Sequence, residues 1–159
     1  MLPSFFMQLS DVFLGLGPET FSGLMKSVSI GKLRTYQLFE RIKTRAHVAK
    51  LNAESLRKAG PRLWARMEAR EEDVAQDLAQ AILVSQLDLI IAVLNFTGVP
   101  HEEGFFSKDI DSSQYLTEGW RERVWEKFRD QYPRPALLFY INHLAWELTR
   151  SDQLFQPAD

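Results

Sequence analysis

The chain has 159 residues, which suits one domain, and its shares of 45% hydrophobic and 25% charged residues are ordinary for a globular protein. It contains no cysteine, which excludes disulfides, thiolate catalysis and cysteine-ligated zinc or iron–sulfur sites. The formal net charge is −2, but the signs are segregated: residues 32–70 carry eleven bases and three acids, and residues 71–118 carry ten acids and one base. The resulting blocks of +8 and −9 predict either charged surfaces that bind partners or pairing of the two blocks inside the protein.

Apolar residues recur at spacings of three and four, and the alternation typical of strands is hard to find. We therefore predict an all-α fold, an irregular bundle of five or six helices with one long central helix. This helical domain is expected to span residues 1–152, followed by a frayed tail over residues 153–159.

Two short helices are predicted near the N-terminus, over about residues 4–16 and 18–26. Gly17 separates them, and Pro18 suits the first turn of the second helix because an N–H at that position has no helical partner. Residues 1–6 lack the basic region and cleavage site typical of a signal peptide.

A third helix is predicted over about residues 32–59, with a heptad-like apolar seam. Three alanines in this seam allow another helix to approach closely. Gly60-Pro61 should end or kink the helix, because proline cannot donate to the helical ladder and restricts the residue before it. The seam consists of Phe39, Ile42, Ala46, Ala49, Ala53 and Leu56.

The longest helix is predicted from Pro61 to Gly98, since neither glycine nor proline occurs between them. If continuous it is about 55 Å long, against about 30 Å for the diameter of a small domain, so one end should project or meet a second subunit. A bend is allowed near residues 71–73, where the apolar pattern lapses. The most apolar run, residues 81–96, is too short and too polar for a membrane-spanning helix.

A loop is predicted over residues 99–112, with Phe105-Phe106 packed onto the body of the protein. Asp111 or Ser113 should cap the next helix. A last helix over residues 135–149 is apolar almost all round, which places it in the core or in an interface. The helix before it should bury Leu116, Trp120, Val124 and Phe128.

Basic side chains flank the seam of the third helix and continue into the next helix. Such a surface can bind nucleic-acid phosphates or anionic lipid, but it is also typical of a solvated face, of internal pairing with the acidic block, or of a protein partner. The pI of about 5.9 and the lack of interleaved aromatic residues count against nucleic acid. The predicted basic surface consists of Arg34, Arg41, Lys43, Arg45, Lys50, Arg57, Arg62 and Arg66.

Three residues are weak ligand candidates: Asp88, His143 and Glu147. Asp88 lies in an apolar stretch, where a carboxylate is either a metal ligand or general base, or else a structural ion pair or an exposed group. His143 and Glu147 lie four residues apart and share a helix face, a spacing that can bind a metal. However, no dinuclear carboxylate, zincin, calcium-loop, phosphate-loop or nucleophile-elbow motif occurs. We therefore predict no catalytic residue, no metal site and no cofactor.

The leading functional hypothesis is a non-catalytic, cytoplasmic protein-interaction module that self-associates, most simply as a homodimer. It depends on the alanine-containing seam, the long helices and the apolar last helix. One alternative is nucleic-acid or anionic-surface binding through Lys32 to Arg70. Another is a small-molecule or metal-binding helical protein that uses Asp88 and His143.

Overall fold

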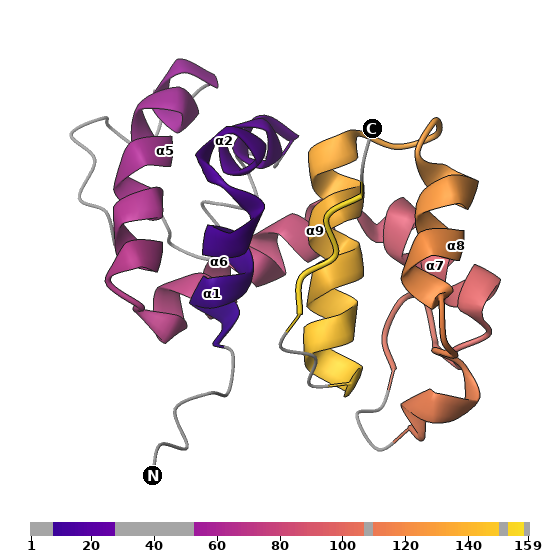
Figure 1. Cartoon of the computed structure of the whole chain (residues 1–159). Helices are drawn as coiled ribbons and strands as arrows, with labels where there is room; N and C mark the ends of the chain where they lie inside the picture. The colour runs from indigo at the N-terminus through magenta and orange to yellow at the C-terminus, as the bar shows by residue number, and fades with distance from the viewer. Residues whose placement is uncertain (1–7, 28–52, 107–109, 150–152, 158–159) are drawn as a thin grey trace, which may run out of the picture. The chain divides into compact units, whose positions relative to one another are not determined.

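The part of the chain that the computed structural model describes is helical and contains no β-strand (Figure 1). The predicted all-α fold is therefore confirmed. The chain divides into two compact units, which we call the N-terminal unit (residues 8–85) and the C-terminal unit (residues 86–159 with residues 1–7). The single domain predicted over residues 1–152 stays a prediction. The described residues are 8–27, 53–106, 110–149 and 153–157.

In the N-terminal unit, α5 (Ala53–Glu68) packs against both α1 (Leu9–Leu16) and α2 (Pro18–Ser27), and α6 (Glu72–Ser85) packs against α1 and α5. The predicted boundary between the first two helices is confirmed at Gly17, whose φ of +89° suits glycine. Burial of apolar side chains on all four helices supplies the stability that short helices lack alone. The fully buried side chains include Phe13, Phe21, Leu24, Leu63, Met67, Leu78 and Ile82.

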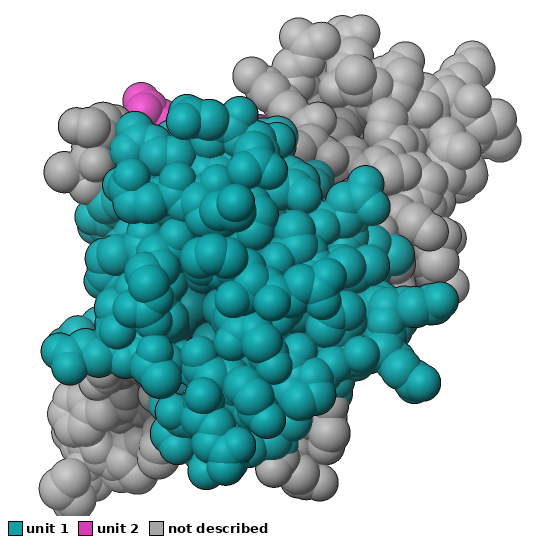
Figure 2. Space-filling view, turned by 90° about the vertical axis from the view of Figure 1, so that its right-hand side faces the viewer, with its two compact units in different colours: residues 1–7, 86–159 teal, residues 8–85 magenta. Residues whose placement is uncertain are grey.

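The described residues of the C-terminal unit, one face of which is teal in Figure 2, form three α-helices and two short helical turns. α8 (Trp120–Phe128) packs against both α7 (Leu87–Thr97) and α9 (Arg134–Leu144). Every residue from Ala136 to Leu144 is buried, as the apolar circumference of this helix predicts. The two turns are a 3₁₀ turn, η3 (Ser112–Gln114), and a π-helical turn, η4 (Ala145–Thr149).

The predicted buried face of α8 is confirmed, because Leu116, Trp120, Val124 and Phe128 are all buried. α8 begins at Trp120, several residues after Asp111 and Ser113, the two predicted caps. Asp111 instead caps η3 by accepting a hydrogen bond from the backbone of Ser113, and the hydroxyl of Ser113 donates a second one at 2.6 Å. These two bonds lower the pKa of Asp111.

Of the two outcomes predicted at Gly60-Pro61, an end or a kink, the end is wrong, because α5 continues through Pro61 to Glu68. A proline inside a helix costs about 3 kcal/mol. Leu63 and Met67 follow it on α5 and are fully buried. Tertiary packing against α1 and α2 therefore outweighs the local preference. Most of the predicted third helix, including its seam as far as Ala49, lies outside the described residues.

The single helix predicted from residue 61 to residue 98 is also wrong, since three helices cover this range. The first break is a Schellman motif: the N–H of Glu71 donates to Arg66 O at 3.2 Å, and the N–H of Arg70 donates to Met67 O at 2.9 Å. Arg70 occupies the left-handed position of this motif, with φ of +57°. A non-glycine residue there is not visible to a search for glycine and proline.

The second break lies at Gln86, whose φ of −124° and ψ of 37° leave the helical region. The hydroxyl of Ser85 donates to Ala81 O at 2.7 Å, a bond that competes with the helical ladder and bends helices. The described ranges thus contain seven α-helices, more than predicted, and no helix long enough to project from a small domain.

Within these same ranges, no single helix has both the length and the apolar character needed to cross a bilayer. α6 and α7 meet that criterion only when they are counted together across their break.

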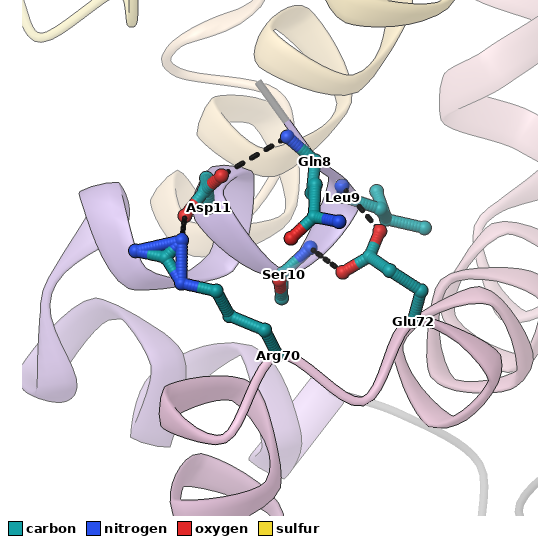
Figure 3. A network of polar contacts seen from close by, with 6 residues as sticks. All are labelled: Gln8, Leu9, Ser10, Asp11, Arg70 and Glu72. Carbon is teal, nitrogen blue, oxygen red and sulfur yellow. Dashed lines mark hydrogen bonds and ion pairs between the residues drawn. The ribbon is translucent and has the colours of Figure 1, made fainter. Parts of the chain in front are cut away.

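The N-terminus of α1 is held by a carboxylate from another helix (Figure 3). Glu72, at the start of α6, accepts from the N–H of Leu9 at 2.8 Å and from the N–H of Ser10 at 3.1 Å. A helix leaves its first N–H groups without helical partners, and its dipole favours negative charge there. Glu72 therefore provides acceptors for two backbone N–H groups of α1 and fixes α1 to α6 at the same time.

Two further contacts extend this network. Asp11 accepts from the N–H of Gln8 at 3.0 Å, and its other oxygen lies 2.9 Å from the guanidinium of Arg70. The turn between α5 and α6 is thus tied to the first turn of α1. At this point an acid and a base of the N-terminal unit form an ion pair.

Candidate functional site

The predicted basic surface lies mostly beyond what the structure describes. Arg62 is exposed, and Arg66 donates through Nη1 to both carboxylate oxygens of Glu71 at 2.9 and 3.0 Å. Glu71 is the first acid of the acidic block, so the two charge blocks meet in an ion pair at their border. Nucleic-acid binding through the basic block stays a prediction. The remaining members are Arg57, whose side chain is not described, and Arg34, Arg41, Lys43, Arg45 and Lys50, which lie outside the described residues.

The three ligand candidates occupy different environments. Asp88 is exposed near the start of α7, whereas His143 on α9 is only 5% exposed. His143 Nδ1 lies 3.5 Å from Oε2 of Glu147 in η4. Among the described residues, no three His, Asp or Glu side chains gather as they would around a metal ion. The structure therefore brings His143 and Glu147 together and leaves Asp88 on the surface.

The His143–Glu147 pair sits among aromatic side chains. The imidazole ring lies 5.5 Å from the ring of Phe139 and 5.9 Å from that of Trp146, centroid to centroid. π-helical turns such as η4 are rare and often occur at functional sites. Here the turn brings Glu147 to the imidazole, but no nucleophile in the described residues is hydrogen-bonded to His143. The arrangement positions an imidazole without showing a reaction for it.

Tyr140, one turn before His143, was not visible as a special residue in the sequence. It is buried, and its hydroxyl has no hydrogen-bond partner among the described residues. Burial of the hydroxyl, followed by the negative charge of Glu147, raises the pKa of Tyr140 above its usual value.

We expect Tyr140→Phe to leave stability at pH 7 unchanged or to raise it by up to about 1 kcal/mol, since it removes a buried hydroxyl without a partner. Above pH 10 the unfolded chain releases the phenolic proton while the folded chain keeps it, so wild-type stability falls as pH rises. The variant lacks this contribution. Urea unfolding at about pH 7 and about pH 10.5 should show a smaller loss for Tyr140→Phe, and an equal loss in both proteins would contradict the assignment.

The most organised surface feature is a tight turn between α7 and η3. Glu102 and Phe105 exchange two backbone hydrogen bonds of 2.8 and 2.9 Å. The two residues between them have positive φ angles, +51° at Glu103 and +93° at Gly104, as a type I′ turn requires. A glutamate in this conformation is uncommon and costs energy.

The side chain of His101 fixes this turn to α7. Its Nδ1 accepts from the N–H of Gly104 at 3.0 Å, so Nε2 carries the proton and donates to Asn95 Oδ1 at 2.7 Å. A Cβ on Gly104 would lie 3.4 Å from the Ile90 side chain, so the backbone of the turn rests directly on the helix.

This rigid turn displays an aromatic ring. Phe105 is 70% exposed, which contradicts the prediction that it packs onto the body, while Phe106 is half-buried. Glu102 and Glu103 beside it are exposed and negative. We call Glu102, Glu103 and Phe105 the acidic-aromatic turn. Gly104 was the one sequence signal for its shape, and nothing in the sequence distinguished the exposed phenylalanine from the half-buried one.

No family model, no curated protein and no solved structure matches this chain.

Proposed function

We propose that the protein is a non-catalytic helical interaction module that self-associates through the acidic-aromatic turn. The observation that carries the proposal is the 70% exposure of Phe105 on a turn whose geometry is fixed from several sides. Full burial of a phenylalanine is worth about 1.5–3 kcal/mol, which this turn forgoes in the isolated chain. Association that covers the ring regains that free energy.

The fixed shape of the turn favours binding. The backbone bonds of the turn and the His101 contacts already restrict the segment, so less conformational entropy is lost when it meets a partner. The strained φ of Glu103 is a feature that proteins retain mainly at functional positions. Aromatic residues are enriched in the buried centres of interfaces.

Charge supports a second copy of this chain as the partner. Two exposed acids flank Phe105, and the chain carries a block of +8 over residues 32–70. Opposite charges on two surfaces steer association and fix the orientation of the complex. The same protein supplies both signs, and closed two-fold dimers are the commonest oligomers.

Three helices replace the predicted long helix, and the residues of the apolar last helix from Ala136 to Leu144 are already buried within the chain. The alanine-containing seam falls largely outside the described residues. Self-association therefore rests on the acidic-aromatic turn.

We expect Phe105→Ala to raise the dissociation constant of self-association by about tenfold or more, because it removes the ring that the interface would bury. Sedimentation equilibrium of both proteins measures this directly. Phe96→Ala is the matched control, since it removes an exposed phenylalanine that lies on α7 rather than in the turn, and it should leave the constant unchanged.

Two results would contradict the proposal. One is a wild-type protein that stays monomeric up to about 1 mM, since an interface weaker than that has little biological use. The other is a dimer that Phe105→Ala leaves as stable as before.

A further inference from the structure

The C-terminal segment, residues 153–157, runs back along α9 (Figure 1). Its main chain is held by the side chain of Asn142: the N–H of Phe155 donates to Oδ1 at 2.6 Å, and Nδ2 donates to Phe155 O at 3.1 Å. Nδ2 also donates to Leu138 O at 2.9 Å within α9. Asn142 is 2% exposed, and two of these three hydrogen bonds of its buried amide are made to the backbone of Phe155.

α8 supplies the second half of this face. The ring of Phe155 meets that of Trp125 edge to face, with centroids 6.2 Å apart. Nη1 of Arg121 donates to Gln153 O at 2.8 Å. Two main-chain positions and one aromatic ring of the segment are therefore recognised, a pattern typical of proteins that bind extended peptides.

The chain's own segment is an incomplete ligand for this face. Phe155 is only partly buried. The indole N–H of Trp125 is buried without a hydrogen-bond partner among the described residues. A buried donor of this kind lowers the equilibrium constant for folding by about tenfold or more relative to one that has a partner. A ligand that covers the face better and offers an acceptor to this N–H would bind more tightly.

Arginines lie at the rim of the face, and one of them, Arg129, also pairs with Glu126 at 3.6 Å. The guanidinium carbons of Arg134 and Arg129 lie 4.9 and 5.8 Å from the centroid of the Trp125 ring, and Arg121 lies on the same helix as Trp125. Three arginines around an aromatic platform favour an acidic ligand.

We propose that the face formed by Trp125 and Asn142 is a recognition site for an extended, acidic segment of a partner protein that carries an aromatic residue, and that the C-terminal segment occupies this site in cis. Hydrogen bonds to the main chain accept many sequences, and Trp125 selects the aromatic residue. The site differs from the acidic-aromatic turn, so it stands or falls independently of self-association.

Competition in cis dictates how the site must be tested. A tethered segment acts at an effective concentration in the millimolar range, so a free peptide reaches the wild-type site only weakly. Phe155→Ala keeps the full chain but removes the ring that seats the cis segment. The probe is a fluorescein-labelled peptide with the sequence of residues 153–159, QLFQPAD.

In fluorescence anisotropy, we expect the labelled peptide to bind the Phe155→Ala protein at least about tenfold more tightly than the wild type. Phe96→Ala, which removes an exposed phenylalanine on α7, is the matched control and should behave like the wild type. The double variant Asn142→Leu/Phe155→Ala should lose binding by about tenfold or more, and a peptide with alanine in place of its phenylalanine should bind weakly to every protein. Equal, weak binding to the wild type and to Phe155→Ala would overturn the proposal.

A second measurement requires no variant. The N–H of Phe155 is protected by Asn142 in the wild-type chain, so its hydrogen exchange should accelerate when excess unlabelled peptide displaces the segment. Unchanged exchange at saturating peptide would contradict an exchangeable site. Self-association of the Asn142→Leu and Phe105→Ala proteins can also be compared. If Asn142→Leu abolishes self-association while Phe105→Ala does not, the site binds the C-terminal segment of a second copy. That result would overturn the proposal of a different partner protein.

Discussion

Asn142→Ala should lower the free energy of unfolding by about 2–3 kcal/mol. The substitution removes three hydrogen bonds, each worth about 0.5–1.5 kcal/mol net, two of which hold the backbone of Phe155. The higher helix propensity of alanine offsets about 0.5–0.7 kcal/mol of this loss. The effect should also be local, since hydrogen exchange at the Phe155 amide should accelerate by more than the exchange of the α9 backbone.

Urea unfolding measures the loss. The matched control is Asn95→Ala, which removes an exposed asparagine with one hydrogen bond to His101 and should cost less than about 1 kcal/mol. If Asn142→Ala were within about 0.5 kcal/mol of the wild type, the contacts between α9 and the C-terminal segment would contribute little to the fold.

Glu72→Ala should cost about 1–2 kcal/mol, the range typical of a lost N-terminal helix cap. Its carboxylate satisfies two N–H groups of α1 and interacts with the helix dipole, and it joins two helices that are far apart in the sequence. Without it, the first turn of α1 should fray, and the amides of Leu9 and Ser10 should lose protection from exchange.

Thermal and urea unfolding of Glu72→Ala can be compared with Glu68→Ala, which replaces an exposed glutamate at the end of α5. The control should stay within about 0.5 kcal/mol of the wild type. Equal, small effects of the two substitutions would show that α1 does not depend on this cap.

Much of the helical content could be read from the sequence, because apolar periodicity reports directly on burial. The face of α8 and the buried circumference of α9 both followed from their spacing. The lapse of the apolar pattern near residues 71–73 indicated a bend close to the first break, but no such lapse indicated the second break at Gln86. Arg70 adopts a left-handed conformation that glycine usually adopts, and Ser85 competes with the helical ladder through one hydroxyl.

Tertiary contacts account for most of the site features that sequence reasoning missed. Pro61 is tolerated because α5 is packed against two other helices, and Asn142 is buried because a segment eleven or more residues later binds it. The exposed Phe105 follows from a turn held by His101 from the preceding loop and by Asn95 from α7. Local patterns cannot reveal partners at such separations. His143 and Glu147 did come together as their spacing indicated, since both lie on one helical segment.

The charge blocks show how a sequence signal depends on its structural setting. Arg66 pairs with Glu71, and Arg70 pairs with Asp11, so these arginines at the border of the two blocks form ion pairs within the N-terminal unit. Such exposed pairs contribute at most about 1 kcal/mol each, and they reduce the free charge that a polyanion would meet.

We propose that copies of this chain meet through the acidic-aromatic turn. Amide chemical shifts recorded by ¹H–¹⁵N NMR over a dilution series locate such an interface residue by residue. We expect concentration-dependent shifts at residues 101–106, and we expect Phe105→Ala to abolish them. Shifts that are absent from this segment, or that persist in Phe105→Ala, would contradict the claim.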